Sequence, residues 1–446
     1  MIQRKAMLFL AEWKKSEYRK PLIIRGARQV GKTTLVKEFA KQYDVFLDLN
    51  LEKPADRQLF EDYDNVHELL TAIFLHKEKR KEGASVLLFI DEIQFSKRAV
   101  AILRYFYEEA NEVHVIVAGS LLETVIDVRK ISFPVGRVQY MALRPCSFLE
   151  FLNGMDSHFD MDLIENLQVI PVVHDRIMKA FQTYTMIGGM PAIVSHYAKN
   201  KDVLALKEIY ESFLISYHDD VEKYTKNAHL IRIIRSILST GWTSAGETIT
   251  FECFGGTSYS SKEISAAFQT IQQAMLLDLI YPTYATQMPV IQNYRKRPKL
   301  VWLDTGLVNF MAGVQKEIFS VPDIQDIWRG RIAEHIVAQE LLAQTESMLT
   351  RRIYWRRDKQ GSEAEVDFVY LYNSLAIPIE VKSGHNSKLK SLHLFMESAP
   401  HDIAVRVWSQ PYSVDEVTTK TGKKFHLINM PFYYTGVIEK VLRQFL

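Results

Sequence analysis

The run Gly-Ala-Arg-Gln-Val-Gly-Lys-Thr at residues 26–33 has the residue types and spacing to hold a phosphate group. Its glycines let the backbone wrap an anion without a clash from a Cβ atom, and the amide groups at the start of a following helix point toward that anion. Residues 21–24 precede the run as a short buried strand would, and residues 34–40 continue it in a helical pattern. This strand–loop–helix context predicts a phosphate-binding loop.

Each residue of this loop is a candidate contact to a bound nucleotide. Lys32 is expected to reach the β- and γ-phosphates, and the Thr33 hydroxyl is expected to bind Mg²⁺. The predicted nucleotide contacts of the loop are Gly26, Ala27, Arg28, Gln29, Val30, Gly31, Lys32, Thr33 and Thr34.

An acidic pair follows the next buried strand that the sequence predicts. Residues 86–90 form a continuous apolar run, as in a strand buried on both faces of a parallel sheet. Asp91 and Glu92 come directly after it, at the carboxyl end where such sheets bind ligands. Asp91 is expected to hold Mg²⁺ through water, and Glu92 to orient and deprotonate the attacking water. Acidic pairs are also common on ordinary surfaces, so this assignment depends on the phosphate loop.

With these motifs the N-terminal part resembles the AAA-type ATPases, in the bacterial group that begins with a short helix. The resemblance implies ATP hydrolysis with ATP and Mg²⁺ as cofactors, coupled to a conformational change; assembly into a homo-oligomer is an open alternative. The segments that carry it, besides the loop, are FIDEIQ at 89–94, AGS at 118–120, and residues 132–138 and 143–148.

Two further residues are candidates for sensing the terminal phosphate. Residues 113–118 predict a third buried strand, and the Ser120 hydroxyl comes just after it, although a Gly-Ser turn explains this residue as well. Arg137 is the preferred arginine to touch a γ-phosphate, in its own subunit or in a neighbour's. The competing arginines are Arg98, Arg104 and Arg144.

Length and composition set the wider limits. The 446 residues are 47% hydrophobic and 24% charged, which is typical of a globular chain of about three domains. A net charge of +2 leaves any nucleic-acid binding to local patches. Cys146 and Cys253 fit a reducing compartment without a disulfide framework. Since no apolar run reaches membrane-spanning length and the N-terminus lacks a cleavage pattern, we expect a cytoplasmic protein without membrane contact.

The middle of the chain predicts helices without a catalytic group. Residues 148–220 have a helical pattern, and two more helices are expected at 230–238 and after an N-cap at Ser261. A strand and the basic cluster RKRPK at 295–299 follow. A helix pair with a basic hairpin fits a winged helix, which can place a helix in the DNA major groove. The alternative is a packing module with a solvated basic loop.

A second group of chemically active residues lies near the C-terminus. Residues 365–370 and 376–382 alternate in polarity as two strands do, which places Glu380 and Lys382 on one face. Together with Asp367, these side chains offer the hard oxygen ligands that Mg²⁺ or Mn²⁺ prefers. A metal ion there would activate water against a phosphodiester, and Lys382 would assist the nucleophile or stabilise developing charge.

Glu334 adds another carboxylate. In the predicted helix at 327–342 it lies seven residues from both Ile327 and Leu341, and therefore on the same apolar stripe. A carboxylate in such a position is costly unless it is paired or bound to a metal ion. An edge position from which the side chain reaches solvent is the alternative.

The order of these C-terminal elements resembles the PD-(D/E)XK nuclease superfamily. A helix, a strand with Asp and a strand with Glu-x-Lys precede a helix at 389–396 and a strand at 403–408. Residues 210–385 resemble more closely the uncharacterised C-terminal domain that accompanies this ATPase group. The segments that carry this second likeness are 300–307 and 330–334.

The resemblance to the nucleases implies roles for four residues. Glu334, Asp367 and Glu380 match the metal-binding positions, and Asp367, Glu380 and Lys382 match the catalytic ones. The superfamily also includes members that only bind, so a complete motif does not by itself establish cleavage.

Basic and aromatic residues alternate in RRIYWRR at 351–357. Such a segment suits phosphate contacts combined with base stacking. An edge strand whose charges block aggregation is the alternative.

Together the patterns predict an α/β chain in four parts: a P-loop NTPase parallel sheet, a helical lid, a winged-helix-like segment and an α/β PD-(D/E)XK nuclease-like domain. The function predicted first is ATP hydrolysis coupled to a domain that acts on nucleic acid, DNA rather than RNA, and cleaves it. One alternative is an ATPase switch whose C-terminal domain binds nucleic acid or protein without cleavage. Another is a scaffold that binds ATP structurally, against which Glu92 argues. The predicted parts are 1–147, 148–228, 229–310 and 311–446.

Overall fold

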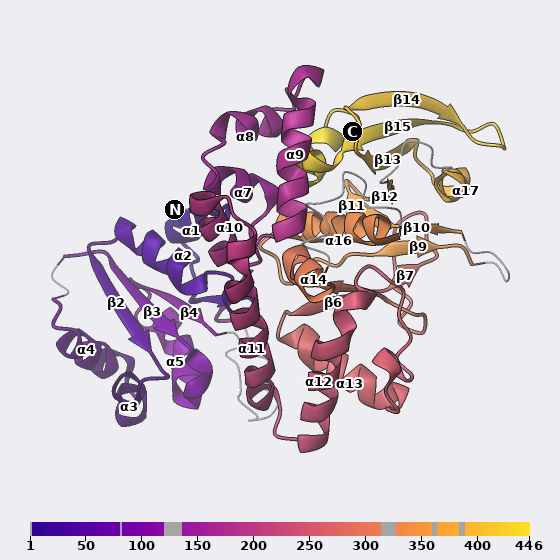
Figure 1. The fold of residues 1–446 in the computed structure, drawn as a ribbon. Coiled ribbons are helices and arrows are strands. Elements are labelled where there is room, and N and C mark those ends of the chain that lie inside the picture. Colours follow the sequence, from indigo (N-terminus) through magenta and orange to yellow (C-terminus); the bar gives the residue numbers. More distant parts are fainter. Residues whose placement is uncertain (1, 81–82, 120–135, 314–326, 359–363, 383–388) are drawn as a thin grey trace.

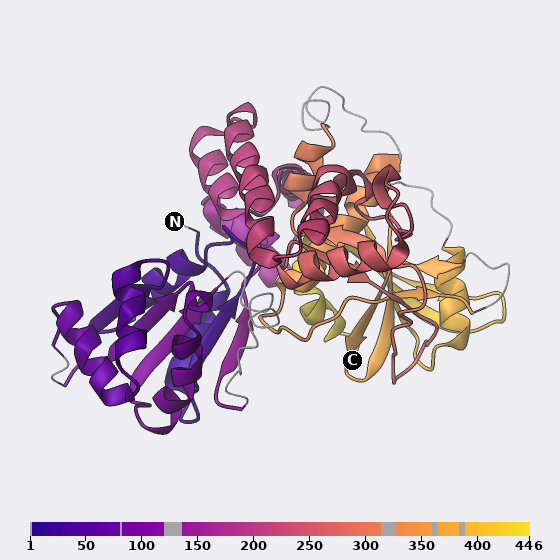
Figure 2. The ribbon, with the colours of Figure 1, turned by 90° about the horizontal axis from the view of Figure 1, so that it is seen from below.

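The computed structural model describes most of the chain and has the predicted α/β architecture (Figure 1). In Figure 1 the N-terminal domain, in indigo and purple, lies on one side, and the C-terminal domain, in orange and yellow, lies on the other. Seen from below in Figure 2, the N-terminal domain is a lobe beside the rest of the molecule. The described ranges are 2–80, 83–119, 136–313, 327–358, 364–382 and 389–446.

The N-terminal domain is built on a parallel sheet with strand order β2-β3-β4-β1-β5. β1 and β3 are buried along their whole lengths because helices cover both faces of the sheet, which explains their continuous apolar sequences. The strands are β1 (Leu22–Arg25), β2 (Val45–Asn50), β3 (Val86–Asp91), β4 (Val113–Ala118) and β5 (Gln139–Ala142).

Helices cover the two faces of this sheet, with α1 and α2 on one face and α3, α4 and α5 on the other (Figure 1). The predicted N-terminal helix is present, and its buried residues Leu10 and Trp13 hold it against the domain. Side chains of Asn65 and Ser96 cap α4 and α5 by accepting backbone N–H groups. The helices are α1 (Ala6–Lys15), α2 (Lys32–Phe39), α3 (Pro54–Asp62), α4 (Val66–His76) and α5 (Lys97–Glu108).

Helices alone make up the next part, as the pattern of residues 148–220 predicts. Gly188 ends α9 with a φ of 73°, a conformation that a residue without a Cβ atom adopts readily. None of the helices that the structure describes is long and apolar enough to cross a membrane. The helices are α7 (Phe148–Gly154), α8 (His158–Glu165), α9 (Pro171–Ile187), α10 (Pro191–Asn200) and α11 (Lys207–Tyr224).

The winged-helix-like segment has the predicted helix pair followed by antiparallel strands, since β6 pairs with β8. The N-cap of its second helix is Ser260 rather than Ser261, because the Ser260 side chain accepts from the Glu263 backbone while Glu263 accepts from the Ser260 backbone. The elements are α12 (Ala228–Thr240), α13 (Ser261–Gln273), β6 (Leu277–Ile280), β7 (Pro282–Thr283), β8 (Lys299–Trp302) and α14 (Thr305–Met311).

The C-terminal domain contains a mixed sheet of strand order β11-β12-β13-β15-β14, and a smaller sheet, β10-β9-β7, joins it to the preceding segment. The strand predicted at 365–370 is divided at Asp367 into two strands that belong to different sheets. The elements are α16 (Ile327–Ala343), β9 (Tyr354–Arg356), β10 (Glu365–Val366), β11 (Phe368–Tyr372), β12 (Leu375–Val381), α17 (Lys390–Ser398), β13 (Ile403–Trp408), β14 (Ser413–Thr418), β15 (Lys424–Pro431) and α18 (Ile438–Leu442).

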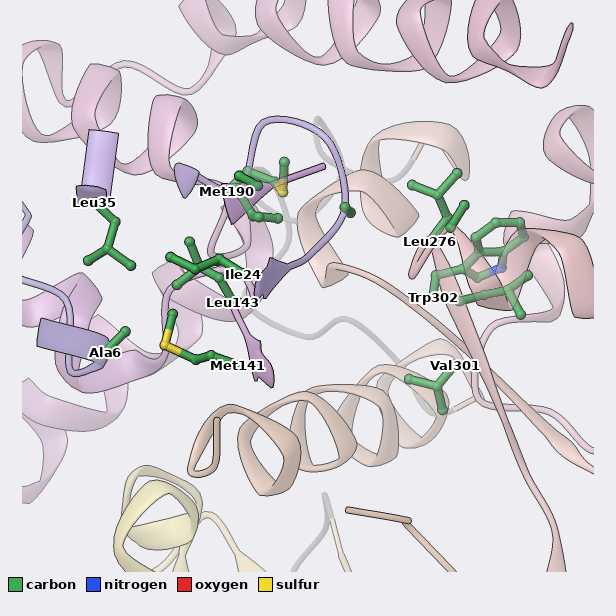
Figure 3. Packing of buried hydrophobic residues seen from close by; sticks show 14 of the residues in the cluster. Ala6, Ile24, Leu35, Met141, Leu143, Met190, Leu276, Val301 and Trp302 are labelled. Carbon is green, nitrogen blue, oxygen red and sulfur yellow. The ribbon is translucent and has the colours of Figure 1, made fainter. Parts of the chain in front are cut away.

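One hydrophobic core runs through all four parts. Figure 3 shows Ile24 and Leu143 of the N-terminal domain near Met190 of the helical part, with Leu276 and Trp302 farther along. A smaller cluster that includes Trp355 and Phe395 fills the space beneath α17. Because the large core crosses the boundaries between the four parts, they are packed together rather than joined only by linkers.

Glu340 is a buried carboxylate at one of these boundaries. Its Oε1 accepts a hydrogen bond of 2.7 Å from the Tyr184 hydroxyl and one of 3.1 Å from the Phe148 backbone. Burial raises the pKa of Glu340 to about 7, whereas these hydrogen bonds oppose the rise. The contact joins α16 to α9 and α7, which lie far from it in the sequence.

This raised pKa predicts a pH dependence of stability. Between the unfolded-state pKa near 4.5 and the folded-state pKa of about 7, the folded chain holds a proton on Glu340 that the unfolded chain releases. This contribution to stability is therefore complete below pH 4.5 and is lost as the pH rises to about 7. In Glu340→Gln the thermal midpoint should fall less between pH 5 and 8 than in the parent, by about 3–6 °C.

The measurement is differential scanning fluorimetry across this pH range, with the exposed Glu12→Gln as the control. An identical pH profile in Glu340→Gln and the parent would contradict the assignment of a proton to Glu340.

Candidate functional site

The predicted phosphate loop connects β1 to α2 and has the backbone conformation that such a loop needs. Gly31, at the start of α2, has a φ of 94°, and Gln29 has a φ of 65°. A Cβ atom at Gly26 would lie 2.3 Å from the Leu143 carbonyl oxygen, so a residue with a side chain does not fit there. Gly31 thus permits a turn, and Gly26 permits the close approach of two backbone segments.

Lys32 and Thr33 lie in the first turn of α2. The Lys32 ammonium is buried and donates to the carbonyl oxygens of Gly26 and Ala27 at 2.9 and 2.8 Å. Burial lowers the pKa of Lys32 to about 8, although the nearby Glu92 and Asp91 oppose this effect. The ammonium group therefore lies within the curve of the loop, where a phosphate group would gain most from its charge.

Asp91 and Glu92 lie at the carboxyl end of β3, next to the loop. The Thr33 hydroxyl donates to Asp91 Oδ2 at 2.7 Å, and the Glu92 backbone donates to Asp91 Oδ1 at 3.0 Å. The Gln94 amide donates to the Glu92 carboxylate, and burial raises the pKa of Glu92. The structure thus brings the four predicted chemical residues of this site together.

Asp220 contacts the loop from α11 and was not predicted from the sequence. Its Oδ2 lies 2.9 Å from Arg28 Nη1, and its Oδ1 lies 2.9 Å from Lys223 Nζ. The carboxylate is 1% exposed. A signal was available, because Tyr217, Asp220, Val221 and Tyr224 share one buried helical stripe, on which a carboxylate needs a partner.

Arg4 contacts the loop from the N-terminal side and was not predicted either. Its guanidinium donates to the Val30 carbonyl at 3.0 Å and to the Arg144 carbonyl at 2.6 Å, and it pairs with Glu150 at 3.0 Å. A single arginine outside any motif gives no sequence signal for this role.

The two predicted phosphate sensors have different outcomes. Ser120 lies outside the described residues. Arg137 precedes β5 at the amino end of the strands, whereas the loop follows the carboxyl end of the neighbouring β1, and Arg137 pairs with Glu108 at 2.6 Å. The arrangement therefore gives no support to a contact between Arg137 and a nucleotide in its own subunit, whereas a contact across subunits stays a prediction.

The competing arginines also have other partners. Arg98 pairs with Glu61 and Asp64, and Arg104 lies 3.9 Å from Glu108. Arg144 donates to the carbonyl oxygens of Leu342 and Ser347 at 3.1 Å each. None of these contacts, in the part of the chain that the structure describes, is with the phosphate loop.

The C-terminal carboxylates surround a lysine that no sequence motif places there. Lys299, the first residue of β8, lies 2.9 Å from Glu334, 2.8 Å from Glu365 and 3.4 Å from Asp367. Burial lowers the pKa of Lys299, but the three carboxylates outweigh it and raise the pKa well above the usual value. A buried ammonium ion thus pairs with Glu334 and Asp367, two of the three predicted metal ligands.

Glu380 and Lys382 form a separate pair beside this lysine. Glu380 Oε1 lies 2.7 Å from Lys382 Nζ, which confirms that the two residues share one face of the strand. Asp367 Oδ2 accepts from the Val381 backbone at 2.8 Å, so this carboxylate is anchored to β12. Burial, reinforced by the charge of Asp367, raises the pKa of Glu380 to about 8.

The Glu334 side chain pairs with Lys299 and is 26% exposed, so it lies between the predicted inward position and the alternative in which it reaches solvent. Burial, with the nearby Asp367, raises its pKa to about 7 against the effect of Lys299. Within the described ranges, no group of three or more His, Cys, Asp or Glu side chains has a geometry that could hold a metal ion. The carboxylates are arranged around an ammonium ion instead.

The structure contradicts both base stacking by residues 351–357 and the edge-strand alternative, whereas phosphate contacts by the exposed Arg351 stay a prediction. Tyr354 and Trp355 are buried and unavailable for base stacking, and Arg352 is buried in an ion pair of 2.7 Å with Asp278. β9 lies between β10 and β7, so it is not an edge strand either. The aromatic rings belong to the core. The alternation of basic and aromatic residues is typical of a half-buried strand and does not reveal this position.

Comparison with known protein families supports the N-terminal assignment. Residues 18–152 match the model of the AAA domain, and they contain the loop and the acidic pair described above. The N-terminal domain is a P-loop ATPase domain of the AAA type. The chain beyond this domain matches two families instead of one, both described only as domains of unknown function, DUF8612 at residues 178–318 and DUF4143 at residues 329–433.

Solved structures give weaker likenesses, which carry no argument on function. The Walker-type ATPase PABY2304 of Pyrococcus abyssi is 14% identical, with 70% of this chain and 96% of that one covered and a TM-score of 0.44. The Aeropyrum pernix ORC2 protein, in ADPNP–ADP complexes, is 13% identical. The match covers 71% of this chain and 92% of that one, with a TM-score of 0.29. The Thermotoga maritima RuvB Holliday junction branch migration motor is 15% identical. The match covers 65% of this chain and 91% of that one, with a TM-score of 0.27. No curated protein matches the chain.

The position of Glu92 predicts a separation of nucleotide binding from turnover. Glu92→Gln keeps the shape of the side chain but removes the carboxylate that accepts a proton from water, so kcat for ATP hydrolysis should fall by about 10²–10⁴-fold. The dissociation constant for ATP should change by less than about threefold.

The measurements are phosphate release at saturating ATP and equilibrium binding of a fluorescent ATP analogue. Glu109→Gln, an exposed glutamate at the end of α5, is the matched control. Hydrolysis by Glu92→Gln at the parental rate would remove Glu92 from its assigned role.

Proposed function

We propose that this protein is an ATP-driven switch whose AAA-type domain hydrolyses ATP with Mg²⁺ and whose C-terminal part binds DNA without cleaving it. The observation that supports the absence of cleavage is the Lys299 ammonium group among Glu334, Glu365 and Asp367. It favours the binding alternative over the cleaving one.

The AAA-type site has a donor set that fits Mg²⁺. The Thr33 hydroxyl and the Asp91 carboxylate are hard oxygen donors within 2.7 Å of each other, and Mg²⁺ is usually held by one or two such protein groups plus phosphates. The ion would neutralise charge on the phosphates. Lys32 would bind the β- and γ-phosphates, and Glu92 would orient water for attack and accept its proton.

Lys299 argues against cleavage at the C-terminal carboxylates. A divalent metal ion activates water as a Lewis acid and lowers its pKa, and an ammonium group with three carboxylate neighbours has no comparable effect. Mg²⁺ would also have to displace a buried lysine whose pKa the same carboxylates raise. The lysine therefore supplies the counter-charge that a metal ion supplies in a nuclease.

The loop between β7 and β8 has the surface that contact with DNA requires. Arg295, Lys296 and Arg297 are exposed, and Tyr294 is 68% exposed. Three adjacent cationic side chains can neutralise backbone phosphates, and an exposed ring beside them can stack on a base. In chain order this loop follows the helix pair α12 and α13, as a wing follows the helices of a winged helix.

One contact and one chain connection suggest how the nucleotide state reaches this surface. The ion pair between Arg28 and Asp220 joins the phosphate loop to α11, and α11 leads directly into α12 of the winged-helix-like segment. A change in the loop on ATP binding or hydrolysis would therefore act on the helix that precedes the proposed DNA surface.

The first prediction from this proposal concerns metal binding. Lys299→Ala removes the ammonium group and leaves three carboxylates around the vacated position, so the variant should bind one more Mn²⁺ ion per chain than the parent does. A dissociation constant on the order of 10⁻⁴ M is expected for such a site.

The measurement is Mn²⁺ binding by electron paramagnetic resonance without nucleotide. Lys296→Ala, a lysine of the exposed loop, is the control, and Lys299→Ala combined with Asp367→Ala should lose the added ion. Equal numbers of Mn²⁺ ions bound by parent and Lys299→Ala would contradict the assignment.

The second prediction concerns DNA affinity. Reversing the charges of Arg295, Lys296 and Arg297 to Glu should weaken binding of duplex DNA at least about tenfold. The slope of log K against log salt should become shallower by about 0.9 for each phosphate that the loop no longer neutralises. ATP hydrolysis without DNA should be unaffected.

Fluorescence anisotropy with a labelled duplex at several salt concentrations measures both quantities. The matched control reverses three exposed cations of the N-terminal domain, Lys53, Lys79 and Arg80. If both triple variants bind DNA as the parent does, the loop is not the DNA surface, and a protein partner becomes the better candidate.

A further inference from the structure

The loop between β7 and β8 exposes apolar side chains as well as cations. Met288, Ile291 and Tyr294 are 43%, 73% and 68% exposed, and the exposed residues Arg295, Lys296 and Arg297 follow them directly. Exposed apolar side chains are ordinary where they are scattered singly. Three of them within residues 288–294, next to three cations, form a combination that contact with phosphates alone does not use.

The backbone of this loop is anchored to the C-terminal domain. The Gln292 amide donates to the Arg352 carbonyl at 3.1 Å, and the Tyr354 hydroxyl donates to the Arg297 carbonyl at 2.8 Å. Val290 packs against the smaller hydrophobic cluster beneath α17. The exposed side chains therefore project from a segment that is already ordered, which reduces the entropy lost when they bind a ligand.

The Tyr294 ring is oriented by two contacts. Its centroid lies 4.8 Å from that of Tyr281, with 58° between the ring planes, and its hydroxyl donates to Gln292 Oε1 at 2.9 Å. Because the side chain remains 68% exposed, these contacts cover only part of the ring. A ring held in this way can stack on a base, unlike the buried Trp355.

The exposed apolar groups distinguish between intact and opened DNA. In an intact duplex the faces of the bases are covered by their neighbours in the stack, so a surface loop meets phosphates and base edges. Insertion of an apolar side chain into the stack requires that a base step first be unstacked. Where bases are already unpaired, their faces are accessible and this cost is smaller.

We propose that the loop recognises DNA at unpaired bases. Tyr294 stacks on an exposed base, Ile291 packs beside it, and Arg295, Lys296 and Arg297 bind the flanking phosphates. This inference rests on the DNA binding proposed above and names the class of DNA that is bound. The described residues 284–298 contain no helix, whereas amphipathic helices are the usual elements that lie in a membrane interface, so a nucleic acid fits this loop better than a lipid surface.

Fluorescence anisotropy of the full chain tests the preference, with and without a non-hydrolysable ATP analogue. The probes are a labelled blunt duplex and the same duplex with several mismatched pairs at its centre, so the two have equal length and charge. The mismatched duplex should bind at least about fivefold more tightly than the intact one.

Substitutions at exposed positions separate the ring from the cations. Tyr294→Ala and Ile291→Ser should each reduce this preference, while affinity for the intact duplex changes by less than about twofold, since phosphate contacts dominate it. Tyr294→Phe keeps the ring and should keep the preference. The matched control is Tyr18→Ala, because Tyr18 is 82% exposed and belongs to the N-terminal domain.

A fluorescent base tests the contact itself. With 2-aminopurine at an unpaired position, emission should fall when the parent binds, because stacking on a ring quenches it, and should fall less when Tyr294→Ala binds at saturation. Equal emission in the two complexes would overturn the contact between Tyr294 and an unpaired base.

The affinities distinguish failure of this inference from failure of the proposed function. Equal affinity for the two DNAs, or an unchanged preference in Tyr294→Ala, would overturn the inference and leave DNA binding in place. If the parent bound neither DNA, the proposed function would fail as well. If in addition vesicles of phosphatidylserine and phosphatidylcholine bound the parent but not Tyr294→Ala, the ring would belong to a membrane contact instead.

Discussion

The ion cluster around Lys299 holds the C-terminal half of the molecule together. One ammonium group neutralises part of the charge of Glu334, Glu365 and Asp367, which come from a helix, from β10 and from the junction between two different sheets. Carboxylates this close repel one another unless a cation lies between them, and a buried cation is costly unless it is paired. The same lysine belongs to β8, so it also attaches the winged-helix-like segment to the C-terminal domain.

The N-terminal half depends on a comparable pairing of buried charge. Lys32 is held by two loop carbonyls, Arg28 by Asp220 of α11, and Arg4 by Glu150 and by two more backbone oxygens. The last two contacts anchor the phosphate loop to different neighbouring segments. A change in the nucleotide bound at the loop would therefore act on Arg4, which precedes α1, on α11 and on Arg144.

Sequence patterns were sufficient where chemistry is local. The phosphate loop, the acidic pair after β3, the helix pair and the face shared by Glu380 and Lys382 follow from spacing and periodicity alone. Patterns were insufficient where a contact joins residues far apart. Lys299 belongs to a cluster predicted as solvated or DNA-binding, yet its side chain is buried among carboxylates 35–68 residues away. Tyr354 and Trp355 could be placed in the core only once β9 was known to lie between two strands.

Binding without cleavage is tested most directly by incubating the purified protein with supercoiled plasmid and Mg²⁺ or Mn²⁺, with and without ATP. Electrophoresis before and after removal of the protein separates retardation from cleavage. We expect the protein to retard the plasmid and to hydrolyse ATP, and the plasmid to be recovered supercoiled. The expectation would be contradicted if the parent protein produced nicked or linear plasmid and the Asp367→Ala variant did not. Cleavage would then depend on the carboxylates that surround Lys299.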